Sequence, residues 1–86
     1  MCAYCLYILE SQINKRYYVG ATNNLKERIV QHNKGRVKST KSGKPWKLKY
    51  YEKHISLSEA RKRELQVKKW KKRAAIEKLI NYGPIV

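Results

Sequence analysis

The 86 residues of the chain suffice for one domain with a modest core, because chains of this size bury only about 60% of their unfolded surface. Lysine and arginine number 21 against six glutamates, and the net charge of +15 favours a polyanionic partner, nucleic acid first. The longest apolar run, residues 1–9, is too short to cross a bilayer, and the basic stretches lack the apolar face of an interfacial helix, so we expect a cytoplasmic protein with no membrane association.

Two apolar segments near the start of the chain, residues 4–9 and 17–21, are rich in aromatic and branched side chains. The polar stretch between them predicts that they form a β-hairpin. Cys2 and Cys5 make a lone CxxC in this region. Residues three apart in a strand point to opposite faces, and no second CxxC could complete a tetrahedral site. We therefore interpret the two thiols as structural.

The pattern changes to that of a helix over residues 24–34. Asn24 and Glu27 are placed as a capping box, and Leu25 and Ile29 are spaced to lie on one helix face. Gly35 is a good helix terminator.

Residues 37–45 are polar and rich in serine, threonine, glycine and proline, which predicts a loop. Residues 46–55 alternate as a third strand. We expect one of its faces to carry Trp46, Leu48 and Tyr50, and the other to carry Lys47, Lys49 and Tyr51.

A second capping box runs from Ser56 to Glu59, with Ile55 and Ala60 placed as a hydrophobic staple. Helical residues continue to about position 80, in one long helix or two, until residues 81–84 (NYGP) stop them.

The order β-β-α-β-α, with the last helix single or split, predicts a small α+β domain that spans residues 1–86. A three-stranded sheet is marginal alone, so helices must flank it. We expect them to cover one face and to leave the other face or its rim for a ligand.

Basic residues concentrate in two stretches. Residues 34–49 hold seven lysines and arginines and no acid, and residues 61–73 hold eight with Glu64 as the single acid. Such runs are either solvated helix faces or phosphate contacts. We favour phosphate contact, and the side chains expected to bind nucleic acid are Lys34, Arg36, Lys38, Lys41, Lys44 and Lys68.

The scarcity of acids limits the metal chemistry that is possible. Six scattered glutamates and two histidines favour at most one metal ion. At about 100° per residue, Glu64 falls in the apolar stripe of its helix, beside Ala60 and Val67. An inward carboxylate must be paired or metal-bound, so the spacing leaves a metal ligand and an ion pair with Lys68 both open.

Arg28 and His32 stand four residues apart and so project from one side of the first helix. Beside a phosphate, this pair could stabilise charge and shuttle a proton, although exposed helices also carry such pairs by chance. His54 has no evident partner, and we interpret it as structural or solvent-exposed.

These residues together resemble the GIY-YIG nuclease superfamily, and in particular its small stand-alone YhbQ-like members. Cys5-Leu6-Tyr7, ten further residues and Tyr18-Val19-Gly20 match the two signature triplets, and Arg28, His32 and Glu64 follow in the expected order. The likeness extends over residues 4–80. The departure lies in the first triplet, where Cys5-Leu6 replaces Gly-Ile.

The resemblance implies a metal-dependent endonuclease that hydrolyses phosphodiester bonds in DNA, with RNA also possible. One divalent ion, Mg²⁺ or Mn²⁺, would bind Glu64. Tyr7 and Tyr18 would meet at the active face, one of them as the general base for water, while Arg28 stabilises phosphate charge and His32 holds a tyrosine hydroxyl or relays its proton. Gly20 would let backbone and substrate approach closely.

Two other classes of function stay open at the level of sequence. The first is a nucleic-acid-binding protein that keeps the fold without catalysis, and the second is an interaction module for an acidic protein partner. The substrate's structure, the oligomeric state and the choice between the two tyrosines are not visible in the sequence.

Overall fold

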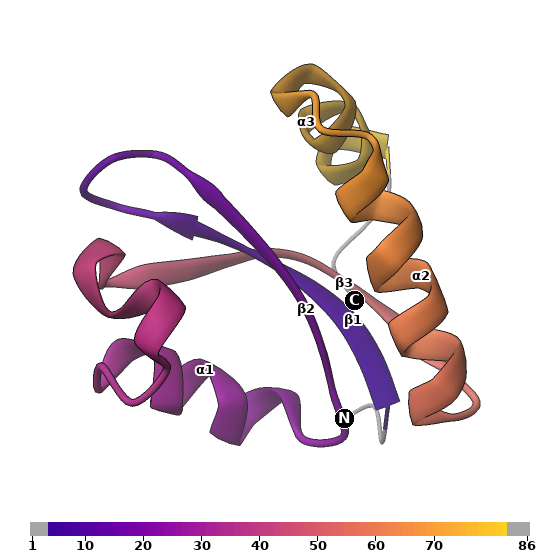
Figure 1. Ribbon diagram of the computed structural model, residues 1–86, viewed down its shortest axis with the longest axis horizontal. Helices are drawn as coiled ribbons and strands as arrows, with labels where there is room; N and C mark the ends of the chain where they lie inside the picture. The colour runs from indigo at the N-terminus through magenta and orange to yellow at the C-terminus, as the bar shows by residue number, and fades with distance from the viewer. Residues whose placement is uncertain (1–3, 83–86) are drawn as a thin grey trace.

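The structure is a computed structural model that describes residues 4–82, shown in Figure 1. Strands and helices follow in the order β-β-α-β-α-α, which confirms the predicted α+β class. The elements are β1 (Tyr4–Ser11), β2 (Tyr17–Thr22), α1 (Leu25–Asn33), the 3-10 helix η1 (Lys38–Gly43), β3 (Trp46–His54), α2 (Leu57–Lys69) and α3 (Arg73–Tyr82).

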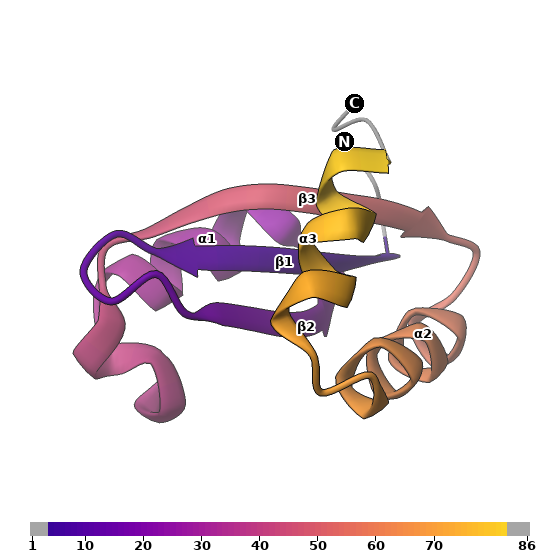
Figure 2. The same cartoon turned by 90° about the horizontal axis from the view of Figure 1, so that it is seen from above.

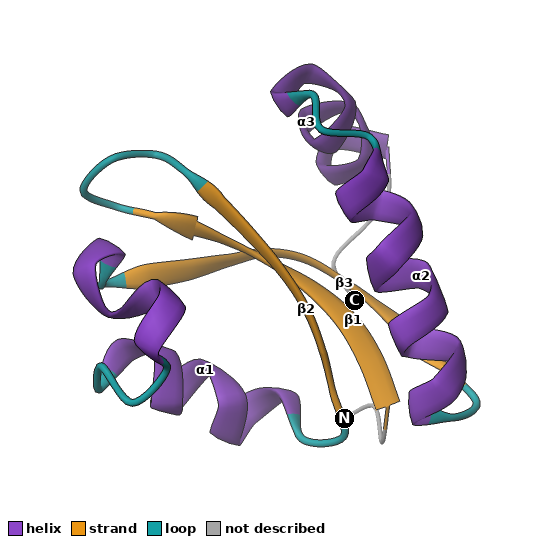
Figure 3. Cartoon of the chain, viewed as in Figure 1, coloured by secondary structure: helices purple, strands orange, loops and turns teal. Residues whose placement is uncertain are grey.

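The sheet is antiparallel, with β1 in the centre and the strand order β2-β1-β3 (Figure 3). Helix α1 lies on one face, and α2 and α3 lie toward the other (Figures 1 and 2). The prediction that the helices cover one face was therefore wrong. The reason is in β1, whose residues 5–9 are all apolar and at most 1% exposed, so that both of its faces need cover.

Two apolar clusters, one on each side of β1, form the core. On the α1 side, Tyr7 and Leu9 pack with Leu25 and Trp46. On the α2 side, Leu6 and Ile8 pack with residues that include Val67 of α2 and, from α3, Ile76 and Leu79. Cys5 is buried in the α1-side cluster as a strand residue, and Cys2 lies outside the described residues.

Strand β3 carries an irregularity that changes which residues face which helix. Ile8 is opposite Tyr50, but the next residue, Leu9, is opposite Leu48, so Lys49 is an extra residue in β3. Trp46 and Leu48 therefore face α1, whereas Tyr50 turns to the α2 side and Tyr51 takes its place on the α1 side. The predicted strict alternation was wrong from this bulge onward.

The two predicted helix starts are present. The Asn24 side chain accepts the Glu27 backbone N–H at 3.2 Å, and the Ser56 hydroxyl accepts the Glu59 N–H at 3.2 Å. The predicted hydrophobic staple before α2 was wrong, because Ile55 is 91% exposed. The chain runs extended through Ser56, which directs Ile55 into solvent.

Most of the predicted loop at residues 37–45 is the 3-10 helix η1. It is tied to the domain by hydrogen bonds, since the Trp46 indole N–H donates to the Thr40 carbonyl at 2.8 Å and the Ser11 hydroxyl donates to the Gly43 carbonyl at 2.6 Å. This segment is therefore built into the fold, and it buries the Thr40 side chain.

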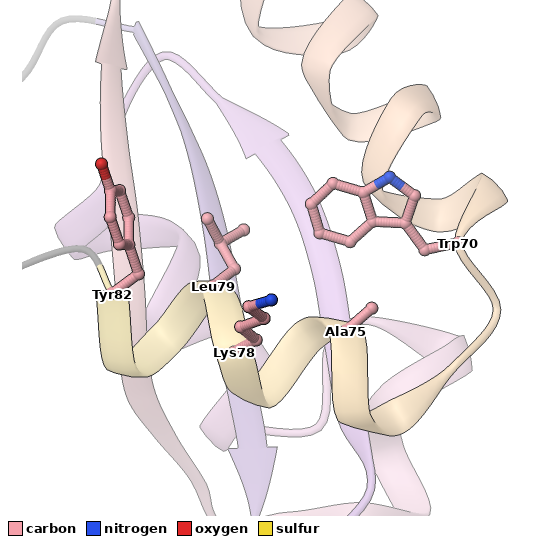
Figure 4. A pocket seen from close by; sticks show the side chains of 5 residues that line it. All are labelled: Trp70, Ala75, Lys78, Leu79 and Tyr82. Atoms are coloured by element: carbon pink, nitrogen blue, oxygen red, sulfur yellow. The ribbon is translucent and has the colours of Figure 1, made fainter.

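The last helical stretch is two helices that part at Lys71, which has a left-handed φ of 56°. Arg73 at the start of α3 lies over the Tyr17 ring and donates to the Lys15 carbonyl, which holds α3 against the hairpin. The described residues include no helix that is long and apolar enough to cross a membrane. Between the end of α2 and α3 lies a groove of about 370 Å³, lined by Trp70 and the side chains labelled on α3 in Figure 4.

Candidate active site

The predicted site residues come from four elements and meet at the edge of the sheet formed by β2. Tyr7 is on β1, Tyr18 on β2, Arg28 and His32 on α1, and Glu64 on α2. The rings of Tyr7, Tyr18 and His32 form a cluster with centroid separations of 4.9–6.2 Å. The structure thus brings together residues that are up to 57 positions apart in the chain.

A buried chain of hydrogen bonds runs from η1 to the Tyr7 hydroxyl. The Thr40 hydroxyl donates to the Val37 carbonyl at 3.3 Å and lies 2.7 Å from Nδ1 of His32, whose Nε2 lies 2.9 Å from the Tyr7 oxygen. A hydroxyl has one proton, so Thr40 accepts from His32 Nδ1–H. In a neutral imidazole the Nε2 atom is then the acceptor, and the Tyr7 O–H donates to it.

The imidazole of His32 is neutral at ordinary pH. Its side chain is fully buried, and burial lowers its pKa from 6.5 to about 4, with a further lowering by the nearby Arg28 charge. A neutral His32 keeps the free Nε2 lone pair that the Tyr7 proton requires.

Burial also governs the phenol of Tyr7. It raises the Tyr7 pKa from 10 to about 12, with Tyr18 and Glu64 acting in the same direction, whereas the Arg28 guanidinium opposes the rise. Tyr7 is therefore a neutral phenol whose proton is committed to His32, while its oxygen lone pairs stay available as acceptors. The Arg28 side chain hydrogen-bonds this hydroxyl, and Glu64 is near enough for its charge to act on it.

Gly20 is the residue opposite Tyr7 in the sheet. A Cβ atom on Gly20 would lie 2.6 Å from both Cζ and Oη of Tyr7, far inside contact distance. The missing side chain therefore accommodates the phenol of Tyr7. The approach of substrate to Gly20 stays a prediction.

Tyr18 is half-buried between the rings of His32 and Trp46. The Lys68 ammonium lies over its ring at 5.8 Å. The same ammonium pairs with Glu64 at 2.6 Å. Helix α2 therefore presents a carboxylate and an ammonium group together beside Tyr18.

Glu64 turns inward as its helical position predicted, with 18% of its side chain exposed. The ion pair with Lys68, one of the two alternatives, is formed. Residues 4–82 contain no cluster of three or more histidine, cysteine or acidic side chains that could hold a metal. A single carboxylate still suits Mg²⁺, which commonly binds one or two carboxylates and completes its shell with waters and substrate phosphate oxygens.

Arg28 lies between two polar hollows at the surface. Its guanidinium donates to the Gln31 side chain at 2.9 Å, and the turn from β2 to α1, residues 22–24, forms the adjoining wall. The guanidinium is thus held beside Tyr7 by a neutral partner, which leaves its positive charge available to an anion.

The predicted nucleic-acid contacts are on the surface. All six side chains are exposed. Five of them lie between the end of α1 and the segment after η1, and Lys68 lies on α2. The five are Lys34, Arg36, Lys38, Lys41 and Lys44. His54 is structural, as expected, since it contacts Glu52 at 3.1 Å.

Sequence reasoning missed Thr40, which lies in the stretch interpreted as a loop. Eight residues separate it from His32, and a threonine among serines and lysines carries no local signal of a buried hydrogen bond. The only available hint was that a buried histidine needs a partner for each ring nitrogen.

The small α+β domain gathers two tyrosines, an arginine, a histidine and one inward glutamate at the edge of its sheet, the set that the resemblance to GIY-YIG nucleases implies. The family model described as the GIY-YIG catalytic domain matches residues 3–79, and the chain belongs to this family. Two UPF0213 proteins match the chain over most of their own length.

The UPF0213 protein of Syntrophus aciditrophicus is 41% identical over 81 residues, which cover 92% of this chain and 91% of the relative. The UPF0213 protein of Staphylococcus haemolyticus is 39% identical over 79% of this chain and 83% of its own length. The structure-specific endonuclease subunit slx1 of Aspergillus terreus is 45% identical over 52% of this chain, but the match covers 13% of that protein. No solved structure matches the chain.

Proposed function

We propose that the protein is an endonuclease that hydrolyses phosphodiester bonds in DNA with the help of one divalent metal ion. The observation that carries this proposal is the buried chain Thr40–His32–Tyr7, which ends beside Arg28 and Glu64. An ordinary core tyrosine needs one hydrogen-bond partner. Tyr7 has the neutral imidazole of His32, in a fixed tautomer, as its acceptor. The charges of Arg28 and Glu64 also act on its hydroxyl.

Tyr7 acts as the general base in this proposal. The water that attacks phosphorus gives its proton to the Tyr7 oxygen as the Tyr7 proton passes to Nε2 of His32, so no free phenolate has to form at a pKa near 12. The imidazolium that results is stabilised by Thr40 at Nδ1. As the sugar oxygen leaves with the P–O electron pair, the imidazolium returns its proton to the Tyr7 oxygen, and Tyr7 passes the proton taken from water to the sugar oxygen through solvent. Tyr18 positions the water or the phosphate.

Charge is handled by groups on both helices. Arg28 stabilises the negative charge that builds on the phosphate oxygens. Glu64 would hold the metal ion. The ion pair between Lys68 and Glu64 would then break, and Lys68 would bind a phosphate oxygen instead. The bound ion would supply Lewis-acid stabilisation of the phosphate and lower the pKa of a bound water. Mg²⁺ and Mn²⁺ both suit an oxygen donor of this kind.

The exposed lysines and arginines beside η1 would hold the nucleic-acid backbone away from the cleaved bond. DNA is the substrate we propose, with RNA as an outcome of the test, and a cytoplasmic location completes the proposal. No base-reading element is evident among the described residues, so we expect the enzyme to respond to the structure of the nucleic acid more than to its sequence.

The test incubates the protein with labelled single strands, nicked and branched duplexes, and RNA, with Mg²⁺, Mn²⁺ or EDTA. We expect cleavage in either metal and none in EDTA. Glu64→Gln and Arg28→Ala should each abolish cleavage, whereas Glu59→Gln, which removes an exposed carboxylate from the same helix, should retain it.

Binding must be measured beside cleavage, because Lys68 already satisfies Glu64 without a metal. That ion pair is the one observation that favours a non-catalytic nucleic-acid-binding protein. If DNA binds and no substrate in the panel is cut, or if cleavage survives both substitutions at the site, the binding protein replaces the nuclease.

A further inference from the structure

Arg28 and Arg61 both line a surface hollow of about 250 Å³. The hollow lies between the turn from β2 to α1 and the first turns of α2. Its lining comprises Ala21, Thr22, Asn23, Arg28, Leu57 and Arg61. We call it the Arg28–Arg61 hollow.

The charges of this hollow are unbalanced. No acid is among its lining residues, whereas the hollow on the other side of Arg28 includes Glu27. Arg61 is exposed and makes no ion pair or hydrogen bond with any other residue in the described part of the chain. Arg63, two residues further along α2, is by contrast bound to Glu52 at 3.1 Å.

Two guanidinium groups that share a concave surface without an acid repel one another, and an anion between them removes that repulsion. The start of α2, one turn before Arg61, adds to the positive potential there. Asn23 is exposed at the rim and offers amide donors to the same anion. A phosphate group fits this set, because guanidinium forks bind phosphate oxygens in pairs.

We propose that the Arg28–Arg61 hollow binds a backbone phosphate of the nucleic acid, the one next to the phosphate that is cleaved. Arg28 lines this hollow and also hydrogen-bonds the Tyr7 hydroxyl. It therefore lies between the proposed position of the cleaved phosphate and that of its neighbour. Arg61 then positions the strand, and Arg28 bridges the neighbouring phosphate and the reacting one. The assignment of the ligand as nucleic acid rests on the function proposed above.

The first experiment uses inorganic phosphate as the probe and needs no cleavage. The full chain is titrated with phosphate at constant ionic strength against chloride, and the backbone amide of Asn23 and the Nε–H signals of Arg28 and Arg61 are followed by NMR. We expect saturable shifts in the wild type and their loss in Arg61→Gln. Lys69→Gln, which removes one exposed charge at the far end of α2, should keep them.

Shifts that do not saturate, or that are the same in Arg61→Gln and the wild type, would overturn the proposal. Because Arg61 is exposed and unpaired, the variant should fold normally, which its thermal unfolding midpoint checks. Saturable phosphate binding without cleavage of any nucleic acid would leave this site standing while the nuclease proposal fails. Cleavage of nucleic acid without saturable phosphate binding would leave the nuclease proposal standing while this site fails.

The second experiment asks whether the bound anion belongs to a nucleic acid. Binding of duplex DNA is measured at several salt concentrations in EDTA, where no cleavage occurs. For Arg61→Gln, the slope of log affinity against log salt should become less steep by about 0.9, as expected for one lost phosphate contact. A duplex with one methylphosphonate at the neighbouring position should weaken binding to the wild type and leave binding to Arg61→Gln unchanged. Equal weakening in both would contradict the proposed pairing of Arg61 with that phosphate.

Discussion

The phenol of Tyr7 is fixed from two directions. Gly20 leaves room for the ring, and His32 receives the hydroxyl proton at 2.9 Å. The tautomer that makes His32 an acceptor is set by Thr40, which touches neither Tyr7 nor the proposed substrate position. Thr40 is therefore a positioning residue whose effect on the reaction passes through the imidazole.

Thr40→Val should reduce cleavage by tenfold or more while DNA binding stays nearly unchanged. Valine cannot accept from Nδ1–H, and the loss of a buried hydrogen bond costs about 1–3 kcal/mol, enough to favour the other tautomer. The Nε2–H of that tautomer cannot take the Tyr7 proton. Nitrogen NMR of His32 should report the change of tautomer, and Thr40→Ser should restore both the tautomer and the rate. An unchanged tautomer in Thr40→Val would contradict this account.

Gly20→Ala should destabilise the fold and displace the Tyr7 ring. The added Cβ would stand 2.6 Å from the ring and its oxygen, and overpacking of this kind costs about 1–3 kcal/mol. Gly43→Ala is the matched control, since its Cβ would stand 2.6 Å from the Trp46 ring. Both variants should lower the unfolding midpoint, but Gly20→Ala should lose more activity at equal folded fraction. Equal losses would indicate that Tyr7 has no special role.

The buried neutral His32 makes stability depend on pH. Its folded pKa, about 4, lies below the unfolded value of 6.5, so the unfolded chain binds the proton first as pH falls. This contribution is fully present above pH 6.5 and is lost between about pH 6.5 and 4. The loss is on the order of 3 kcal/mol in the free energy of unfolding.

Denaturant unfolding of wild type and His32→Gln across this range isolates the contribution. Glu52, whose pKa is lowered despite burial by hydrogen bonds from Tyr50 and Arg63, titrates in both proteins and so cancels in the difference. The wild type should lose more stability than the variant between pH 6.5 and 4. Parallel curves would show that His32 is not held neutral by the fold.

Local chemistry made the beginnings of the elements predictable. The caps at Asn24 and Ser56 depend on side chains within three residues of the backbone groups they satisfy, and both are present. The inward turn of Glu64 also followed, because helical periodicity places it among apolar residues. Features that depend on distant partners were not visible: the extra residue Lys49 in β3 is defined only by pairing with β1, and the contact of Thr40 with His32 only by the packing of η1.

The elements divide the site between two rigid parts. Helix α1 and β1 hold the Tyr7–His32 pair, whereas α2 brings Glu64 and Lys68 around the edge of β2. The bidentate contact of Arg63 with Glu52 ties α2 to the far strand β3, so the position of Glu64 depends on an ion pair outside the site. The break before α3 lets Trp70 and α3 cover the rest of the α2 side.

Lys71→Gly should stabilise the protein by about 0.5–1 kcal/mol. Lys71 adopts a φ of 56°, a left-handed conformation that costs an ordinary residue about 1–2 kcal/mol and that glycine adopts without this cost. Glycine loses more backbone entropy on folding, which offsets part of the gain. Lys72 precedes α3 without a positive φ, so Lys72→Gly should destabilise or leave stability unchanged. Chemical denaturation of the two variants provides the comparison. A stabilising Lys72→Gly or a destabilising Lys71→Gly would contradict the assigned break between α2 and α3.

At the scale of the whole molecule, a net charge of +15 is concentrated on a domain with a radius of gyration of 12.0 Å. The charges that are not paired repel one another in the folded state and less so in the expanded unfolded chain. The same charges attract a polyanion, and so the feature that lowers stability also supports binding.

Salt should therefore act on folding and on DNA binding in opposite directions. Raising NaCl from about 0.01 M to 0.15 M shortens the Debye length from about 30 Å to 8 Å, which screens the self-repulsion and should raise the thermal unfolding midpoint. Duplex binding should weaken over the same range, with a log–log slope of about −5 if the six predicted side chains each contact one phosphate. Replacing Lys38, Lys41 and Lys44 by glutamine should make that slope less steep by about 3 and reduce the stabilisation by salt. Thermal unfolding measures the effect of salt on stability, and fluorescence anisotropy measures its effect on DNA binding in the same samples. An unfolding midpoint that falls as salt rises would show that local ion pairs, not net repulsion, dominate the electrostatics of this fold.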